Sequence, residues 1–393
     1  MTLEAANNSA EFNPPKPTAI DLFCGAGGMS LGLQRAGFAV ICAADFWRIA
    51  VDTYQQNFAH RVICTDLTAC SASELNRLTA VPKLLVDLVV GGPPCQGFSI
   101  QRVGSDVDHR NNLVFEFARL VIEIAPTYFM MENVPGLLGK RGHCVLEAFF
   151  EAVDAAGYEA EAHIVNAADY GIPQIRRRVI IYGWQRGRGH RVSIPPTTHS
   201  PQTYATVWEA IGDLPVPAAP GNQLVKDALH RASRLSELNR RRLKHIPPGG
   251  GMQDLPVELR VACHKAGADK IGHRYVYGRL ASDRPSSTIT AGFDSFTRGR
   301  FAHPREDRNI TLREGARLQS FPDDFRFAGN REEIAAQIGN AVPPKLAEIL
   351  AGAFLTVMNP SSTFVRPSIV GESAVTGTYS LDQPSLFPSE LLK

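Results

Sequence analysis

Short apolar runs alternate with helical patterns through the first half of the chain. Residues 29–36 and 111–125 carry apolar side chains at the three- and four-residue spacing of a helix packed on one face. Largely apolar runs of four to eight residues are typical of strands buried on both faces of a parallel sheet. The first four such runs are residues 18–23, 38–44, 61–64 and 86–91. We therefore predict an α/β fold built on a doubly wound, mostly parallel sheet.

The same alternation continues to about residue 186. Apolar runs at 127–131, 159–166 and 179–183 predict three more strands, and helical spacing covers 144–156. From Gly187 onward the alternation fades, and Pro, Gly, Arg and His become frequent. This change of pattern indicates a second domain.

Domain limits follow from these changes. We expect one domain from residues 18–186 together with 326–358, because a helical pattern returns near the C-terminus. Residues 187–325 then form a second, inserted domain. The polar leader 1–17 and the Ser-, Pro- and Thr-rich tail 359–393 are predicted to be disordered.

Composition narrows the class of protein. The 393 residues are 44% hydrophobic and 20% charged, which suits a globular chain with a sizeable core. The leader lacks the basic and apolar segments of a signal peptide, and no apolar run approaches the length that crosses a bilayer. We therefore expect a cytoplasmic protein with no membrane partner. Seven cysteines without a Cys-x-x-Cys pair argue against a disulfide framework and a zinc ribbon.

A glycine-rich turn between the first strand and the first helix is a candidate nucleotide site. Cys24-Gly-Ala-Gly-Gly28 lets the backbone approach a ligand closely, although such a turn alone is weak evidence. Asp45 ends the second strand, where an acid can accept hydrogen bonds from a ribose. Phe46 could stack on adenine or belong to the core, and Asp66 with Leu67 could meet the adenine amino edge. The turn lacks the third glycine of the dinucleotide fingerprint, which favours a single adenosine over NAD.

A thiol follows the fourth strand. Pro93 and Pro94 stiffen the chain before Cys95, and ligands of open α/β sheets sit beyond the carboxyl ends of the strands. Cys95 is therefore a candidate nucleophile, and the alternative is a buried structural cysteine. Residues 96–112 are polar and too long for a tight connection, and such loops often act as lids.

A carboxylate and two arginines could share the site with this thiol. Glu132 follows the fifth strand and could face Cys95 across one small ring, the alternative being a solvated surface acid. Arg176 and Arg178 stand at the start of a strand, where alternate side chains share a face, and Arg177 points away. Two cations on one face suit an anionic partner or an ion pair with Glu132.

A basic stretch lies in the second domain, between His230 and His245. The net charge of the chain is only +2, so any affinity for nucleic acid must come from such a local cluster. A run of one sign can be the solvated face of a helix or a set of phosphate contacts. The candidates for phosphate contact are Arg240, Arg241, Arg242 and Lys244.

Six motifs, in order, resemble those of the C5-cytosine DNA methyltransferase family. They are Asp21-Leu-Phe-Cys-Gly-Ala-Gly-Gly28, Gly91-Gly-Pro-Pro-Cys-Gln-Gly-Phe-Ser99, Glu132-Asn-Val134, Gln174-x-Arg-x-Arg178, Arg284 to Thr290 and Gly339-Asn-Ala-Val-Pro343. The resemblance covers about Thr18 to Met358. It implies a Rossmann-like domain that binds S-adenosyl-L-methionine and an inserted target-recognition domain. It also implies a final helix that packs back at the cofactor.

The resemblance also implies a reaction. Cys95 adds to C6 of a flipped-out cytosine, which makes C5 nucleophilic enough to take a methyl group and leaves S-adenosyl-L-homocysteine as product. Glu132, protonated when it acts, assists at N3, while Arg178 stabilises the ring carbonyl and Arg176 is a second choice. The implied cofactor contacts are Phe23, Gly25, Gly27, Asp45, Phe46, Asp66, Leu67, Gly92, Pro93, Leu113, Asn340, Ala341 and Val342. Contact with double-stranded DNA is expected at Gln96, Ser99 and the basic cluster.

Other interpretations stay open. Family members often have Glu at the position of Asp45, so ribose contact could be weaker here, and we expect Cys24 to be a packing residue. An RNA methyltransferase of the two-cysteine type would carry Thr-Cys in place of Glu132-Asn133, and a tRNA-acting relative would carry a Cys-Phe-Thr signature that we do not find. A non-catalytic DNA-binding regulator would have lost Cys95 or Glu132. A partner restriction endonuclease and a monomeric state are expectations from the family alone.

Overall fold

The structure is a computed structural model that describes residues 16–71, 73–74, 86–94, 112–140, 142–220, 227–260 and 276–358. The predicted site residues Cys95, Gln96 and Ser99 lie outside the described residues. So do the tail 359–393, the leader up to residue 15 and the predicted loop up to residue 111.

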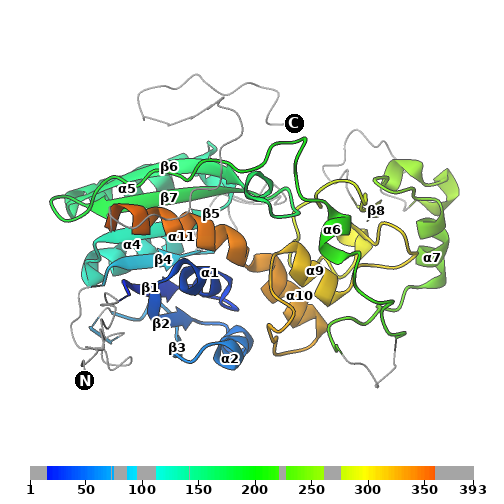
Figure 1. The fold of residues 1–393 in the computed structure, drawn as a ribbon, viewed down its shortest axis with the longest axis horizontal. Helices are drawn as coiled ribbons and strands as arrows, with labels where there is room; N and C mark the ends of the chain where they lie inside the picture. The colour runs from blue at the N-terminus through cyan, green and yellow to red at the C-terminus, as the bar shows by residue number, and fades with distance from the viewer. Residues whose placement is uncertain are drawn as a thin grey trace, which may run out of the picture.

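Seven strands form one sheet in the order β3-β2-β1-β4-β5-β7-β6 (Figure 1). They are β1 (Thr18–Leu22), β2 (Ala39–Asp45), β3 (Arg61–Cys64), β4 (Leu88–Gly91), β5 (Tyr128–Asn133), β6 (Tyr158–Asn166) and β7 (Arg177–Gln185). The pairs from β3 to β5 are parallel, and β7 runs antiparallel to both of its neighbours. The doubly wound, mostly parallel sheet predicted from the apolar runs is therefore confirmed.

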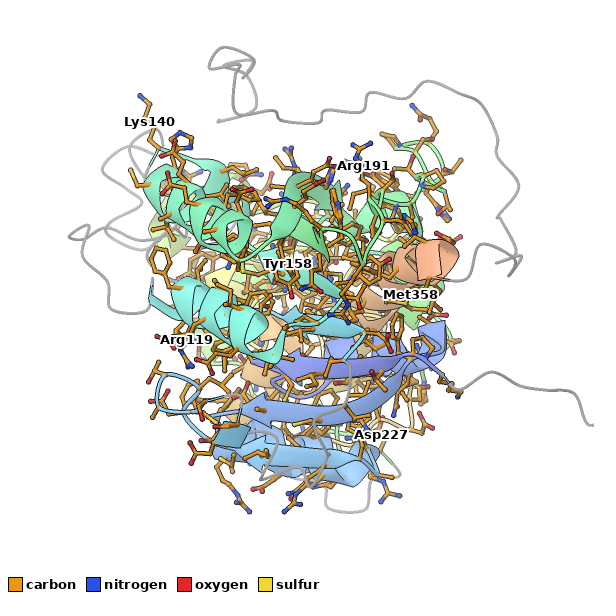
Figure 2. The ribbon with its side chains drawn as sticks, turned by 90° about the vertical axis from the view of Figure 1, so that its left-hand side faces the viewer. Arg119, Lys140, Tyr158, Arg191, Asp227 and Met358 are labelled. Atoms are coloured by element: carbon orange, nitrogen blue, oxygen red, sulfur yellow. The ribbon has the colours of Figure 1, made fainter. Side chains whose placement is uncertain are left out.

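Helices cover both faces of this sheet. The helices are α1 (Gly28–Ala36), α2 (Arg48–Asn57), α4 (Asn112–Ile124), α5 (His143–Ala155) and α11 (Pro344–Met358). Phe117 of α4 and Phe149 of α5 pack with Phe129 on one face, whereas Leu33 of α1 and Phe354 of α11 pack on the other. In Figure 2, Arg119 on α4 and Met358 at the end of α11 lie on opposite sides of the strands.

The last helix packs against the first one at two glycines of α1. A Cβ at Gly28 would lie 2.4 Å from the Val342 carbonyl oxygen, and one at Gly32 would lie 2.5 Å from the Ala347 Cβ. Only residues without a side chain allow this approach. The segment that leads from α10 (Arg331–Asn340) into α11 therefore lies directly beside the glycine-rich turn.

The second lobe consists of short elements. Its helices are α6 (Val207–Ile211), α7 (Glu237–Lys244) and α9 (Leu312–Leu318), and its small sheet pairs β8 (Gly278–Arg279) with β9 (Arg300–Ala302). The 3₁₀ turns are η3 (Pro135–Leu138), η4 (Ala167–Tyr170), η5 (Met252–Asp254), η6 (Val257–Leu259) and η8 (Phe296–Arg298). In Figure 1, α9 and α10 lie between the large sheet and α7.

A shared apolar cluster joins the two lobes. Tyr54 and Phe58, from the α2 region, pack in one cluster with Phe321 and Phe325. The chain after β7 also stays with the first lobe for some distance, since Val192 belongs to the core under α11. The lobes are therefore packed together, not joined only by a linker.

One segment is long and apolar enough to cross a membrane by length and composition alone, contrary to our expectation from the sequence. It is Arg331–Met358, which contains an 18-residue apolar window. The segment is divided into α10 and α11, and Leu346 and Leu350 of α11 are almost fully buried against the sheet. The core helix of a globular protein satisfies the same test, and this packing accounts for the apolar composition.

Candidate active site

The two glycines predicted to cradle a ligand have opposite surroundings. Both adopt positive φ, +52° at Gly25 and +94° at Gly27. A Cβ at Gly25 would meet nothing within 4 Å, whereas one at Gly27 would lie 2.4 Å from the Phe58 ring. The turn is thus open at Gly25 and closely supported from behind at Gly27. Phe23, at the end of β1, is also in the left-handed region with φ +57°.

Asp45 shapes this turn. One carboxylate oxygen accepts a hydrogen bond from the Gly25 N–H at 2.8 Å, and the other accepts one from the Trp47 N–H at 2.8 Å. Burial raises the pKa of Asp45, and these N–H donors oppose that rise. Beside it, Phe46 leaves 66% of its surface exposed at the tip of β2. An exposed aromatic ring at this point can stack on a planar ligand.

The other predicted cofactor residues occupy the same end of the sheet or the elements beside it. Asp66 is exposed after β3, with Oδ1 accepting hydrogen bonds from the Thr68 N–H and hydroxyl, whereas Leu67 is buried. Leu113 is half-buried in the first turn of α4. Asn340, Ala341 and Val342 form the α10–α11 connection beside Gly28.

Cys24 is a packing residue in this structure. It is 6% exposed, and burial raises the pKa of its thiol well above the ordinary value, with Asp21 and Asp45 adding to the rise. A buried thiol of raised pKa stays protonated and unreactive. This agrees with the role expected from the sequence.

The ends of β4 and β5 lie together. A Cβ at Gly92 would be 3.6 Å from Oε2 of Glu132, and the Asn133 side-chain amide donates a hydrogen bond to the Pro93 carbonyl at 3.1 Å. Glu132 lies inside β5, not after it as predicted, because the strand continues through Asn133 by pairing with β7. Cys95 follows this Gly92–Pro94 arm by one residue.

Glu132 forms an ion pair with Arg178. The Arg178 Nε lies 2.8 Å from Oε1 of Glu132, with the two side chains 14% and 12% exposed. The ion pair suggested by the spacing of Arg176 and Arg178 is therefore present for Arg178.

Arg176 is engaged elsewhere. Its guanidinium donates to the carbonyl oxygens of Ile289, Gly339 and Ala341 at 3.2, 3.2 and 2.9 Å. Burial, assisted by the Arg178 cation, lowers the pKa of Arg176 to about 9. Arg176 thus fixes the turn before α11, and the described contacts of its terminal nitrogens are all to backbone carbonyls of other segments.

Sequence reasoning did not assign roles to two buried glutamines that hold the same turn. Gln174 donates to Oε1 of Gln319 at 2.8 Å and accepts from the Ile289 N–H at 2.9 Å. Gln319 in turn donates to the Ile338 and Ala341 carbonyls. The two-residue period of Gln174, Arg176 and Arg178 is the spacing of one strand face, but β7 begins only at Arg177, and nothing local to Gln319 reveals its partner.

The basic cluster divides into exposed and buried members. Arg240, Arg241 and Lys244 are exposed on α7, with Arg240 3.4 Å from Glu237. Arg242 is 8% exposed, donates to the Leu259 carbonyl at 2.8 Å and lies over the Tyr277 ring. Arg242 therefore differs from the expectation of phosphate contact, because its side chain points into the lobe.

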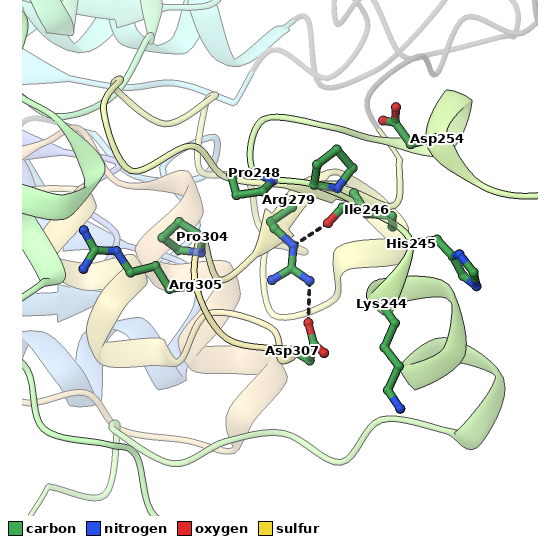
Figure 3. Close-up of a pocket in the computed structure, with 10 residues that line it drawn as sticks. Lys244, His245, Ile246, Pro248, Asp254, Arg279, Pro304, Arg305 and Asp307 are labelled. Carbon is green, nitrogen blue, oxygen red and sulfur yellow. Dashed lines mark hydrogen bonds and ion pairs between the residues drawn. The ribbon is translucent and has the colours of Figure 1, made fainter.

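An open pocket of about 760 Å³ adjoins α7 (Figure 3). Its rim includes Lys244, His245 and Arg305, and its floor includes Arg279, which donates to the Leu243 and Ile246 carbonyls and to Asp307. The buried arginine thereby ties the end of α7 to the 303–307 loop.

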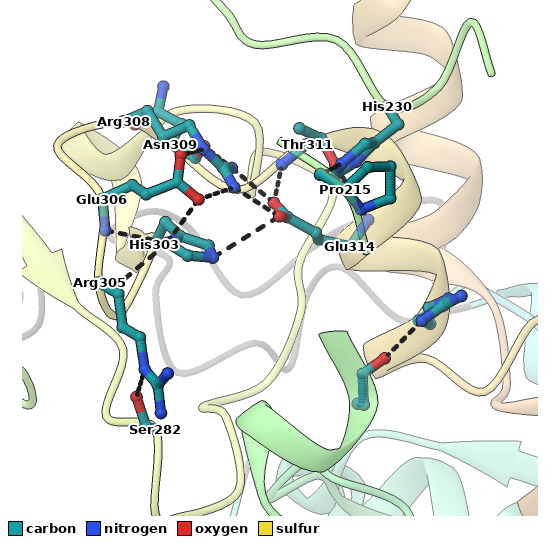
Figure 4. A network of polar contacts seen from close by, with 12 residues as sticks. Pro215, His230, Ser282, His303, Arg305, Glu306, Arg308, Asn309, Thr311 and Glu314 are labelled. Carbon is teal, nitrogen blue, oxygen red and sulfur yellow. Dashed lines mark hydrogen bonds and ion pairs between the residues drawn. The ribbon is translucent and has the colours of Figure 1, made fainter. Parts of the chain in front are cut away.

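A charge network fixes the other side of that loop (Figure 4). Arg308 contacts both Glu306 and Glu314, at 3.0 and 2.7 Å. His303 lies 3.7 Å from Glu314, and burial lowers its pKa to about 4, so it is neutral at physiological pH. Among the described residues no cluster of His, Cys, Asp and Glu is suited to hold a metal ion.

Comparisons with known proteins match the chain over most of its length. The family model for C-5 cytosine-specific DNA methylase matches residues 18–356. Type II methylase M.HgiDII of Herpetosiphon aurantiacus is 38% identical over 338 residues, 84% of this chain and 93% of that protein. Type II methyltransferase M1.HphI of Haemophilus parahaemolyticus is 38% identical over 343 residues, 86% of each chain. The crystal structure of an E. coli prophage protein, described as a DNA modification methyltransferase, superposes with a TM-score of 0.69 at 27% identity, covering 88% of this chain and 100% of that one.

Proposed function

The chain belongs to the C-5 cytosine-specific DNA methylase family, and from this premise we propose how its residues methylate cytosine. It is a DNA (cytosine-5) methyltransferase of the type II restriction–modification kind. The observation that carries the proposal is the Glu132–Arg178 ion pair beside the Gly92–Pro94 arm that leads to Cys95. The target is one cytosine in a short duplex sequence.

The residues at the carboxyl end of the sheet fit S-adenosyl-L-methionine, the methyl donor that the family implies. Gly25 leaves open space where a Cβ would stand, Asp45 holds the turn, and Phe46 exposes a ring for adenine. Asp66 places an exposed carboxylate just after β3. When bound, S-adenosyl-L-methionine supplies an electrophilic methyl group.

Cys95 is the nucleophile in this proposal. C5 of cytosine is a poor nucleophile until the ring gains electron density, and addition of the Cys95 thiolate to C6 supplies it. After C5 is methylated, a base removes the C5 proton and the sulfur–C6 bond breaks, which restores the aromatic ring and the free thiolate.

Glu132 and Arg178 stabilise the charge that this addition creates. Negative charge develops at N3 and the carbonyl oxygen as sulfur adds to C6. Glu132, protonated when it acts, donates at N3, and Arg178 both orients the carboxyl group and attracts the developing charge. The 2.8 Å distance from Arg178 Nε to Glu132 Oε1 supports the orienting role of Arg178.

DNA must be distorted for this chemistry. C6 cannot be reached in a stacked duplex, so the cytosine is flipped out of the helix. Gln96 and Ser99 stay sequence-based candidates for contact near the flipped base, and Arg240, Arg241 and Lys244 are candidates for phosphate contact on the second lobe. A separate cognate endonuclease, a monomeric enzyme and a cytoplasmic location complete the proposal.

Base-resolution 5-methylcytosine sequencing tests the proposal. Plasmid DNA is recovered from cells expressing the chain and from cells expressing Cys95→Ala. We expect methylated cytosines in one short sequence context, absent with the variant. Methylation that persists with Cys95→Ala contradicts the covalent mechanism. Absence of methylation from both samples contradicts DNA as the target. The next assay is then transfer of the methyl group from labelled cofactor to tRNA.

A further inference from the structure

Five side chains form a hydrogen-bonded chain behind the glycine-rich turn. Ser30 of α1 donates to Oδ2 of Asp21 at 2.6 Å, and the Tyr54 hydroxyl donates to Ser30 Oγ at 2.6 Å. The same hydroxyl lies 2.6 Å from Nε2 of His60, whose Nδ1 lies 3.3 Å from the Gln34 amide. The chain links β1, α1, α2 and the loop before β3.

The protons in this chain run in one direction. Tyr54 has a single hydroxyl hydrogen, which is given to Ser30, so His60 must donate its Nε2–H to the Tyr54 oxygen. His60 Nδ1 then carries no hydrogen, so it accepts a hydrogen bond from the Gln34 side-chain amide. Burial lowers the pKa of His60 to about 4, so the ring is the neutral form that this pattern requires. Each donor therefore points toward the Asp21 carboxylate.

Asp21 needs that support. It is 1% exposed, and its Oδ1 has no hydrogen-bond partner among the described residues. Asp45, which holds the Gly25 N–H, adds charge repulsion to the burial of Asp21. A carboxylate in such surroundings is stabilised by donors that are themselves polarised by further donors.

The chain also contacts the turn directly. A Cβ at Gly27 would lie 2.9 Å from Cδ2 of Tyr54 and 2.4 Å from Phe58, whose ring is 4.3 Å from that of Tyr54, centroid to centroid. Tyr54 therefore both supports the turn through its ring and fixes the gap between α1 and α2 through its hydroxyl.

From these contacts we infer that Tyr54 and His60 are positioning residues for cofactor binding. Acting through Ser30 and Asp21, they hold the Gly25–Gly28 turn in the conformation that accepts the adenosine cofactor. Neither touches the reacting atoms, so their loss weakens cofactor binding and leaves the turnover of bound substrate almost unchanged. The inference rests on the proposed use of this turn as the cofactor site.

Calorimetric binding of S-adenosyl-L-homocysteine and steady-state kinetics test it together. We expect Tyr54→Phe to raise the Kd for this product and the KM for S-adenosyl-L-methionine about three- to tenfold, because the hydroxyl that joins Ser30 to His60 is lost. The kcat at saturating cofactor stays within twofold. His60→Leu gives the same pattern, and His60→Gln, whose amide can still donate to Tyr54, restores most of the affinity.

Tyr182→Phe is the matched control. Tyr182 is fully buried, and its hydroxyl donates to the Leu350 carbonyl at 2.8 Å, away from the turn. The Tyr182→Phe variant should have a lower melting temperature and an unchanged Kd for S-adenosyl-L-homocysteine. Equal weakening by Tyr54→Phe and Tyr182→Phe, or a loss of kcat with an unchanged KM, overturns the inference. Failure of the unsubstituted protein to bind the product instead overturns the proposed cofactor site itself, and the inference with it.

Discussion

Arg178 and Glu132 meet diagonally across an antiparallel strand pair. Glu132 of β5 stands opposite Ile180 of β7, and Arg178 is two residues from Ile180 along the same strand face. Side chains at such diagonal positions are within reach of each other when one of them is long. The pair therefore depends on the register of two strands that are 44 residues apart at their nearest ends, Asn133 and Arg177.

Glu132 and Arg178 are expected to act as one unit. Glu132→Gln and Arg178→Gln should each lower kcat by about 10²-fold, since each removes stabilisation of charge on the ring. The double variant should lose little more than either single one, because the second change removes an interaction already lost. Single-turnover rates on duplex DNA measure this.

Arg177→Gln is the control for that pair, because Arg177 is exposed and points to the other face. It should keep kcat within about twofold of the unsubstituted value, given the ordinary size of surface effects. Losses that multiply in the double variant would show that Glu132 and Arg178 act independently.

Phe46→Ala should weaken cofactor binding without destabilising the fold. Stacking of a base on an aromatic ring is worth about 1–3 kcal/mol, and the Phe46 ring is largely exposed, so little core packing is lost. Calorimetry with S-adenosyl-L-homocysteine measures the change in Kd. Val257→Ala, also an exposed apolar side chain but on the second lobe, should leave the Kd unchanged. An unaltered Kd for Phe46→Ala would mean that adenine binds elsewhere.

Lys244 and Arg242 should separate DNA contact from stability. Lys244→Gln should reduce the slope of log K against log salt concentration by about 1, the effect of one phosphate contact. Arg242→Gln should leave that slope unchanged and lower the free energy of unfolding by roughly 1.5–3 kcal/mol, because a charged donor to the Leu259 carbonyl is lost. DNA titrations at several salt concentrations and urea unfolding provide the two measurements. A reduced salt slope for Arg242→Gln together with an unchanged slope for Lys244→Gln would place the phosphate contact at Arg242.

Asp21 should make stability fall as pH rises toward 7. Burial raises its pKa from 3.8 to about 7, with Asp45 adding repulsion and Ser30 opposing the rise; Cys24, Cys42 and Tyr54 are the other titratable groups near it. Between pH 3.8 and about pH 7 the folded chain binds the Asp21 proton more tightly than the unfolded chain does. The free energy of unfolding therefore falls as the pH rises through this range.

Asp21→Asn removes that proton equilibrium. The difference in free energy of unfolding between variant and unsubstituted protein should change by roughly 4 kcal/mol, in favour of the variant, from pH 4 to pH 7 and then level off. Urea unfolding across this range measures the difference. A constant difference would show that Asp21 titrates normally in the folded state.

The local features of this protein follow from its sequence. Each strand of the large sheet was predicted within a few residues, because buried strands need continuous apolar runs. The glycine-rich turn follows from chain geometry over a few residues. Arg176, expected to share a strand face with Arg178, instead precedes β7 and binds backbone carbonyls of other segments. The ion pair of Glu132 with a strand-start arginine was also among the expected outcomes.

For the other polar side chains, tertiary structure decided which of them meet. Neighbouring Arg241 and Arg242 look alike in the sequence, yet only Arg242 turns inward, onto Tyr277 and Leu259. Gln174 and Gln319 are 145 residues apart and bind each other, and Tyr54 meets Ser30 only because α2 packs beside α1. Such partners are chosen by how preformed elements pack, where a buried donor must find an acceptor, and periodicity along one segment carries no information about the segment it will contact.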